Sequence, residues 1–394
     1  MAHQTGLSLF PELQRELRAF RSTGILPCQR IRELLAAGCI RAPADAGVEE
    51  AQLQPASIDL RLGPVAYEVR ASFLPGEAAT VESKLRRLTV ARLDLTAPAE
   101  LARGHVYVIP LLEELRLPPN IMGKANPKST IGRLDVFTRL LTDGANQFER
   151  VARGYRGGLY AEVAPRTFSV LVHAGTRLNQ LRFMRGNPPP SDSSLQALHE
   201  HETLVYLDGG EPGNATIGRG LWISIDLSGS GQSLVGYRAR HGAPVLDLDR
   251  IGYYDPADFW EPIAPLPERE LVLEPDEFYL LASRERVRVP PSFAAEMVSY
   301  DPFVGEFRIH YAGFFDPGFG YGNDDVKGTR AVLEVRSHEV PFLLKDGQLI
   351  GRLIYERLLG LPEKVYGPSI GSSYQQQEIA LSKQFRREVA QDVG

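Results

Sequence analysis

The residues best suited to chemistry lie in segment 126–133, which reads Asn-Pro-Lys-Ser-Thr-Ile-Gly-Arg. The proline favours an extended backbone before it, so a helical turn beginning at Ser129 would place Arg133 four residues further on the same side. The Lys128 ammonium, the hydroxyls of Ser129 and Thr130 and the guanidinium could then converge on one anion. These residues predict a phosphate-binding site, although they fit a capped surface helix equally well. No Gly-x-x-x-x-Gly-Lys-Ser/Thr pattern occurs, so this is not the loop of the common nucleoside triphosphatases.

The composition describes a globular protein that binds small anions locally. The 394 residues are 43% hydrophobic, which is enough for two or three domains. The net charge of -5 and the lack of a long basic run argue against a nucleic-acid polymer or an anionic membrane as partner. Cys28 and Cys39 are the only cysteines. They argue against a disulfide framework, a thiolate metal site and secretion, so we expect a cytoplasmic protein.

The hydrophobic pattern changes along the chain. Residues 9–37 predict two short amphipathic helices, and from Ala56 onward short alternating runs punctuated by Gly and Pro predict β-strands. The proline-rich stretch 187–194 predicts a linker. We therefore expect an N-terminal helical cover (1–48), a first β domain (49–187), a linker (188–214), a second β domain (215–360) and a C-terminal tail (361–394).

The two β domains repeat one another in sequence. The tetrapeptide Ser-Ile-Asp-Leu at 57–60 recurs at 224–227, an offset of 167. Further landmarks recur in the same order at an offset of 172: Leu117-Pro118-Pro119 and Val289-Pro290-Pro291, Glu162 and Glu334, Gly175 and Gly347, Phe183 and Tyr355. Such agreement predicts a duplicated domain of about 150 residues. Many short strands with tight turns favour closed or sandwiched antiparallel sheets.

In these features the chain resembles the dCTP deaminase branch of the dUTPase-like superfamily, in a two-domain form. The resemblance covers most of the chain. It depends on Ser-Ile-Asp-Leu, residues 127–133, Gly-Phe-Phe-Asp-Pro-Gly-Phe at 313–319, Val-Leu-Glu-Val at 332–335, and Tyr366 with Ser-Tyr-Gln-Gln-Gln at 373–377. It implies a mainly β fold of two tandem distorted jelly-roll β-barrels with short N-terminal helices. It also implies assembly into a homo-oligomer with nucleotide sites between domains, and hydrolysis of dCTP to dUTP and ammonia with Mg²⁺ carried by the triphosphate.

Deamination without a protein-bound metal needs an acid-base group. Zinc deaminases use a His and a Cys-x-x-Cys, which two isolated cysteines cannot supply. A carboxylate must therefore accept the proton of the attacking water, and apolar neighbours that raise its pKa favour this role. Glu162 and Glu334 each lie among apolar residues of an expected strand. Either could instead be an ordinary polar residue on the outer face of a sheet.

The resemblance favours Glu334 of this pair. The first domain keeps the Lys-Ser-Thr segment and Arg133, but its counterpart of the family's aspartate segment, 151–155, has no aspartate. The second domain keeps Asp316, but its counterpart of the Ser-rich segment, 299–306, lacks the arginine. One pairing thus stays complete. It implies that Lys128, Ser129, Thr130 and Arg133 hold the triphosphate, that Asp316 positions the sugar and that Glu334 activates water, with Glu162 a relic or a structural residue.

The tail and the reaction leave alternatives open. Tyr366 and Gln377 match the spacing of family residues that close over the nucleotide, while Ser373 stands where the family often has a lysine. A rival activity is dUTP diphosphatase, alone or following deamination. Another is a nucleotide-binding regulator that has lost turnover. The number of chains in the assembly also stays open. Three domains form one ring in the family, and chains of two domains cannot complete such a ring without sharing domains.

Overall fold

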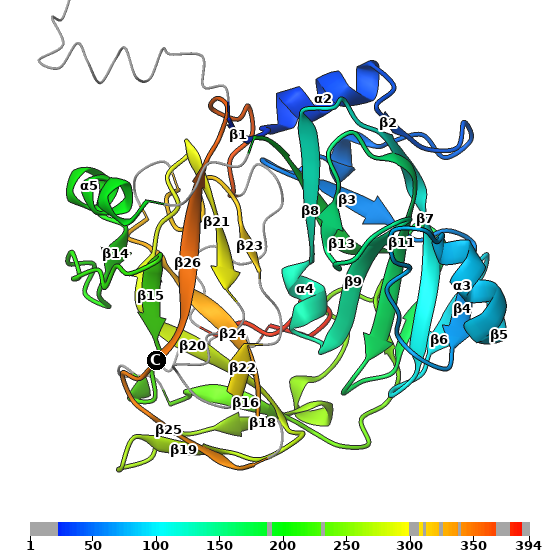
Figure 1. The fold of residues 1–394 in the computed structure, drawn as a ribbon. Coiled ribbons are helices and arrows are strands. Elements are labelled where there is room, and N and C mark those ends of the chain that lie inside the picture. The colour runs from blue at the N-terminus through cyan, green and yellow to red at the C-terminus, as the bar shows by residue number, and fades with distance from the viewer. Residues whose placement is uncertain are drawn as a thin grey trace, which may run out of the picture.

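The computed structural model describes residues 23–186, 191–229, 233–298, 307–309, 313–322, 326–337, 340–367 and 379–387, and its fold is mainly β (Figure 1). We call 23–186 the first half, 191–367 the second half and 379–387 the C-terminal segment. The second expected N-terminal helix is α2 (Cys28–Ala36), which ends before Gly38 at φ 66°. The first lies outside the described residues. No helix in the described ranges combines the length and apolar character needed to cross a membrane.

The strands of the first half form three groups. One sheet has the order β1 (Gly24–Ile25), β13 (Arg177–Arg185), β8 (Ile121–Pro127), β10 (Arg150–Val151), with β3 (Ile58–Arg61) also on β13. A second has the order β5 (Thr89–Asp94), β4 (Val65–Val69), β7 (Val106–Arg116), β11 (Arg156–Pro165), β9 (Val136–Thr142), with β2 (Ile40–Arg41) on β7. The third pairs β6 (Ala99–Leu101) with β12 (Val170–Val172). Helix α3 (Val81–Leu88) joins β4 to β5.

The second half repeats this strand order. Its first sheet runs β15 (Leu221–Ser224), β26 (Leu349–Arg357), β21 (Phe293–Val298), β23 (Phe314–Phe315). Its second runs β18 (Trp260–Ile263), β16 (Gly236–Ala239), β20 (Phe278–Val287), β24 (Thr329–Ser337), β22 (Phe307–Ile309), with β14 (Val205–Tyr206) on β20. A third pairs β19 (Glu270–Leu273) with β25 (Phe342–Lys345). The matching order of strands confirms the predicted duplication.

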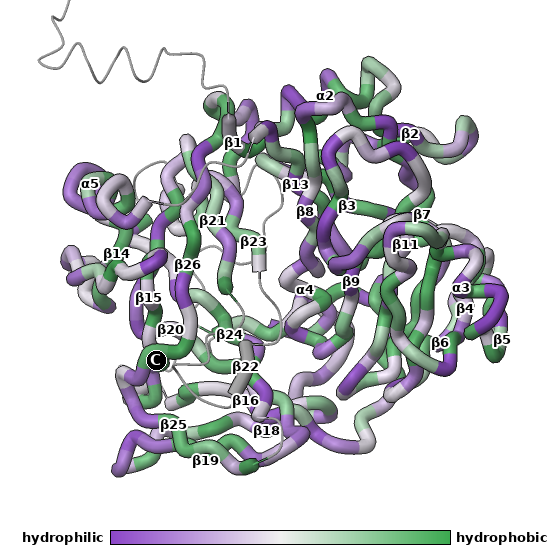
Figure 2. Tube along the Cα trace, in the orientation of Figure 1, coloured by the Kyte–Doolittle hydropathy of each residue, from purple (hydrophilic) through white to green (hydrophobic). Residues whose placement is uncertain are grey.

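Alternation along the strands builds the core and places the site. In β24, Leu333 and Val335 are fully buried in the core of the second half. Glu334, between them, and Arg336, after Val335, point to the opposite face because successive strand residues alternate. Figure 2 shows hydrophobic stretches running along the strands of both halves. The alternation along β24 therefore places its polar side chains, Glu334 and Arg336, on the face opposite the core.

The two halves lie side by side, with the short helix α4 (Ser129–Gly132) between them (Figure 1). Strand β12 of the first half pairs in parallel with β17 (Leu246–Asp247) of the second. Phe385 of the C-terminal segment packs against Phe259, with ring centroids 5.2 Å apart, in a core cluster that includes residues of both halves. The two halves are therefore joined by a strand pair and by a shared core cluster.

The segment predicted as a linker (188–214) is more ordered than expected. It contains α5 (Asp192–Glu202) and β14, and Leu195, Leu204 and Val205 are buried in the core of the second half. The prediction was wrong from residue 191 onward, because few apolar side chains suffice to dock a capped helix. Here the Ser191 hydroxyl accepts from the Ser194 amide at 3.3 Å. Residues 23–48 likewise add strands β1 and β2 to the first half instead of forming only a helical cover.

Candidate functional site

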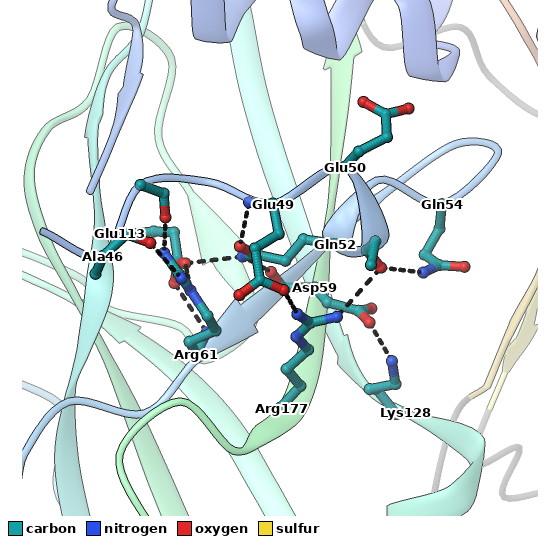
Figure 3. Close-up of polar contacts among 12 residues, drawn as sticks. Ala46, Glu49, Glu50, Gln52, Gln54, Asp59, Arg61, Glu113, Lys128 and Arg177 are labelled. Carbon is teal, nitrogen blue, oxygen red and sulfur yellow. Dashed lines mark hydrogen bonds and ion pairs between the residues drawn. The ribbon is translucent and has the colours of Figure 1, made fainter. Parts of the chain in front are cut away.

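Lys128, which the sequence predicts to bind an anion, lies between the end of β8 and the start of α4. Its backbone is extended (φ -69°, ψ 143°) and α4 begins at Ser129, as the sequence predicts. The Lys128 ammonium pairs with Asp59 of β3, whose side chain is only 2% exposed (Figure 3). Behind it, Gln52 donates to the Asp59 carbonyl and to the Glu113 carboxylate, both at 2.9 Å. This buried network fixes β3 and therefore the position of Lys128.

Arg133 ends α4 and is buried. Its Nη1 donates to the carbonyl of Ala380 in the C-terminal segment at 2.7 Å, and the Ser382 hydroxyl donates to the Thr130 carbonyl at 2.7 Å. The segment is thus fastened to α4 at two points. Ser129 and Arg133 line the cavity described below, whereas Thr130 lines a neighbouring one.

The second half contributes Glu334 to the same cavity. Its residue is only 6% exposed, and burial raises the pKa of its carboxyl to about 8. The positive charge of Arg133, from the first half, acts in the opposite direction, as does the amide of Glu334 itself, while Asp135 adds to the increase in pKa. A carboxyl with such a pKa exchanges protons near neutral pH, which suits general acid-base work.

Asp316 follows β23 and faces the first half. Burial raises the pKa of its carboxyl, although Arg182 of β13 opposes the shift. Arg182 is 1% exposed and donates to the Phe315 carbonyl at 2.9 Å and to Asp316 Oδ1 at 3.1 Å. Tyr366 packs nearby, because its amide donates to the Pro317 carbonyl at 2.7 Å. The position of the Asp316 loop therefore depends on a residue of the other half.

One cavity brings most of the predicted residues together. It is lined by Lys128, Ser129 and Arg133 from the first half and by Asp316, Glu334 and Tyr366 from the second half. The structure thus assembles the pairing that the sequence favours, within a single chain. In this conformation the cavity measures about 60 Å³, space for a few water molecules.

The alternative glutamate lies elsewhere. Glu162, on β11, is 2% exposed, does not line this cavity and accepts a hydrogen bond from Arg139 Nε at 3.1 Å. Arg139 neighbours it on β9 in direct register. The adjacent guanidinium makes Glu162 one partner of a structural ion pair on the second sheet. Gln377 and Ser373 lie outside the described residues.

Three residues that shape the site, Arg182, Arg336 and Thr167, carry no sequence pattern that predicts their role. Arg182 holds the Asp316 loop, as described above. Arg336, two residues after Glu334 on the same face of β24, pairs with buried Asp135 and donates to Thr167 Oγ1 at 3.0 Å. Thr167 donates to Asp135 Oδ2 at 2.6 Å. Each arginine crosses from one half to the other, a relationship that no local periodicity encodes.

Within the described ranges, no group of three or more His, Cys, Asp or Glu side chains is placed to hold a metal ion. The cavity instead presents the cations of Lys128 and Arg133, which flank α4, on one side and the largely buried carboxyls of Asp316 and Glu334 on the other. This arrangement can hold a phosphorylated ligand and exchange a proton with it or with water.

Comparison with known proteins defines the class. Residues 22–187 match the family model for the 2'-deoxycytidine 5'-triphosphate deaminase N-terminal domain, and residues 191–385 match the model for its C-terminal domain. The protein is therefore a hydrolase of the kind that acts on a cytosine C–N bond. It belongs to the dCTP deaminase family.

Individual relatives of this chain are also named as dCTP deaminases. A crystal structure of 2'-deoxycytidine 5'-triphosphate deaminase from Agrobacterium tumefaciens superposes with a TM-score of 0.81 at 50% identity, covering 86% of this chain and 100% of that chain. A "dCTP deaminase, dUMP-forming" from Parafrankia is 32% identical over 153 residues, 37% of this chain and 72% of the relative. An enzyme of the same name from Halobacterium salinarum is 31% identical over 121 residues, 30% of this chain and 57% of the relative.

Proposed function

We propose that this chain hydrolyses the cytosine amino group of dCTP, giving dUTP and ammonia. One observation carries the proposal. Glu334 has a buried carboxyl with a pKa of about 8 and lines the same cavity as Lys128 and Arg133. The family match and the printed names of the relatives support the substrate.

In the proposed complex, Lys128, Ser129 and Arg133 contact the triphosphate, and Thr130 contributes through its place in α4. Asp316 accepts a hydrogen bond from the sugar hydroxyl. The base then extends towards Glu334 on β24. This orientation is supported by the two sides of the cavity, because the cations come from one half and the carboxyls from the other.

The proton movements balance with one water molecule. The Glu334 carboxylate accepts a proton as the water oxygen attacks C4 of the cytosine ring. The carboxyl passes this proton to ring nitrogen N3. It then accepts the second proton, from the new C4 hydroxyl, and passes it to the amino group, which leaves as ammonia when the C4–N bond breaks. Carbon 4 becomes a carbonyl, so dCTP and water give dUTP and ammonia. General acid-base catalysis of this kind contributes roughly 10² to 10⁴-fold.

Magnesium enters the proposal as part of the substrate. Mg²⁺ binds readily to triphosphate oxygens and keeps several water ligands. The donors nearest the expected phosphates are ammonium, hydroxyl and guanidinium groups, which suit the anion and not the cation. We therefore propose that the substrate is the Mg–dCTP complex and that no side chain needs to ligate the metal.

Several broader features belong to the same proposal. Each half is a distorted jelly-roll barrel of the dUTPase type, and Tyr366 with Gln377 closes over bound nucleotide. The protein is a cytoplasmic homo-oligomer. Lys124 and Glu296, which pair across the two halves, are 172 positions apart and so occupy equivalent repeat positions. Equivalent positions meet only near an axis relating the halves, as in a ring of such domains. Mass measurement in solution tests the number of chains.

A bifunctional reaction is the second candidate. The names of the Halobacterium and Parafrankia enzymes specify dUMP as product, which would require loss of diphosphate after deamination. The experiment is to incubate the purified protein with Mg–dCTP and to measure ammonia and pyrophosphate separately. Ammonia alone supports the leading proposal, whereas equal amounts of both support the bifunctional one. Tight dCTP binding without ammonia release would instead identify a regulator.

A further inference from the structure

A second polar cavity adjoins the proposed active site. It measures about 250 Å³ and shares Lys128 with the cavity described above. Three further basic side chains line it, those of His173, Arg177 and Lys383. Thr130, which lies outside the first cavity, contributes to this one. The cavity therefore has four basic side chains against one carboxylate, that of Asp249, adjoins the proposed phosphate-binding residues and is large enough for a phosphate group.

Three of these four basic side chains are already paired. Lys128 pairs with Asp59, and Arg177 donates to the Ala51 carbonyl at 3.2 Å and pairs with Glu49 (Figure 3). His173 Nε2 lies 2.8 Å from a carboxylate oxygen of Asp249. The Lys383 ammonium, in contrast, has no ion pair or hydrogen bond to any residue in the described ranges. It is the charge in this cavity that remains available to a ligand.

The backbone holds Lys383 in place although its charge is unpaired. Its neighbours Ser382 and Gln384 are buried; the first donates to the Thr130 carbonyl at 2.7 Å and the second to the Leu248 carbonyl at 2.9 Å. The carbonyl of Lys383 itself accepts from Gly252 at 2.9 Å. Partial burial and the nearby charge of Lys128 lower the pKa of Lys383. The charges of Lys128 and Lys383 repel each other. The carboxylates of Asp59 and Asp249 offset part of this repulsion, and an anion between the two lysines would relieve more of it.

We propose that this second cavity is a phosphate subsite in which Lys383 and Lys128 bind one phosphate group together. The group is either the terminal phosphate of the nucleotide or a free pyrophosphate. The nucleotide as source rests on the proposed function, whereas binding of free pyrophosphate does not. In both cases Lys383 extends the phosphate-binding surface beyond the residues of α4.

The test compares Lys383→Met and Lys383→Arg with the wild-type protein. Lys345→Met is the matched control, because Lys345 lies on β25, is exposed and does not line either cavity. Calorimetry measures binding of pyrophosphate, dCMP, dCDP and dCTP, each with Mg²⁺. For Lys383→Met we expect affinity for pyrophosphate or dCTP to fall roughly tenfold, as for loss of one charge-assisted hydrogen bond. Affinity for dCMP should change less than about twofold, and Lys383→Arg should bind like wild type.

Comparing the four ligands shows whether the bound phosphate belongs to the nucleotide or to free pyrophosphate. A loss confined to dCTP assigns the subsite to the nucleotide's terminal phosphate, and a loss confined to pyrophosphate assigns it to the free anion. Equal losses for dCMP and dCTP, or no loss for either dCTP or pyrophosphate, would overturn the subsite. A wild-type protein that binds pyrophosphate through Lys383 but binds no deoxycytidine nucleotide would keep the subsite and refute the proposed function.

Discussion

Arg182 Nη2 donates a hydrogen bond to Asp316 Oδ1 at 3.1 Å, joining β13 of the first half to the loop after β23 of the second. The same guanidinium donates to the Ala295 carbonyl at 2.9 Å and lies 3.9 Å from the centre of the Phe314 ring. A planar, permanently charged group with several donors can make all these contacts at once. The site therefore depends on the boundary between the halves, and Arg182 acts on it through Asp316.

We expect substitution of Arg182 to impair sugar positioning and stability. Arg182→Met leaves Asp316 buried without its cation, so its pKa should rise further and the free energy of unfolding should fall by about 3–5 kcal/mol. Arg182→Lys keeps the charge but not the forked geometry, so the fold should persist while KM for dCTP rises. Thermal melts and steady-state kinetics over pH measure both effects. Wild-type KM and melting temperature in both variants would contradict this role.

The repeat and the helical turn at Ser129 could be predicted because short sequence motifs determine them. A period of two on β24 separates Leu333 from Glu334, and an X-Pro step before Lys128 delays the helix to Ser129. The choice of Glu334 for the cavity followed from which motif each repeat had kept.

Other features could not be predicted. The pair of Asp135 with Arg336 joins residues 201 positions apart in different halves, and the docked position of α5 depends on a core that the sequence does not display. Likewise, Lys383 in a polar tail carries no pattern that would place it beside Lys128. Long-range polar pairs depend on how the halves meet, whereas periodicity reports only which residues are buried.

Substituting the two candidate glutamates separates their roles. Glu334→Gln removes the proton acceptor but keeps the shape of the side chain, so ammonia release should fall roughly 10² to 10⁴-fold while dCTP still binds. Glu162→Gln should retain most activity, because Glu162 faces Arg139 and not the cavity. Single-turnover assays and calorimetry check both variants. The reverse result, an active Glu334→Gln and an inactive Glu162→Gln, would overturn the assignment.

The pH dependence follows from the raised pKa of Glu334. Only the ionised carboxylate accepts a proton from water, and its pKa in the free protein is about 8. Hence kcat/KM should increase about tenfold per pH unit below that value and level off above it. Measuring kcat/KM between pH 5.5 and 9.5 with saturating Mg²⁺ tests for this increase and for the plateau above the pKa. A profile that is flat from pH 6 to 9 would exclude Glu334 as the group that must ionise.

A second glutamate with a raised pKa, Glu149, offers a matched test of stability. Burial raises the pKa of Glu149 to about 8 as well, and its Oε2 has no hydrogen-bond partner among the described residues. Both this residue and Glu334 have ordinary pKa values near 4.5 when unfolded. Between those pH values the folded state holds protons that the unfolded state releases. Each carboxyl therefore lowers the free energy of unfolding as pH rises from about 4.5 to 8.

Replacing either glutamate by glutamine removes this penalty. At pH 5, Glu149→Gln and Glu334→Gln should lie within about 1 kcal/mol of wild type, whereas at pH 8.5 each should be more stable by at least about 1 kcal/mol. Urea unfolding at the two pH values measures the difference. Deamination distinguishes the variants, because Glu149 does not line the cavity and Glu149→Gln should stay active. A stability difference that is the same at both pH values would show that neither carboxyl is held protonated by burial.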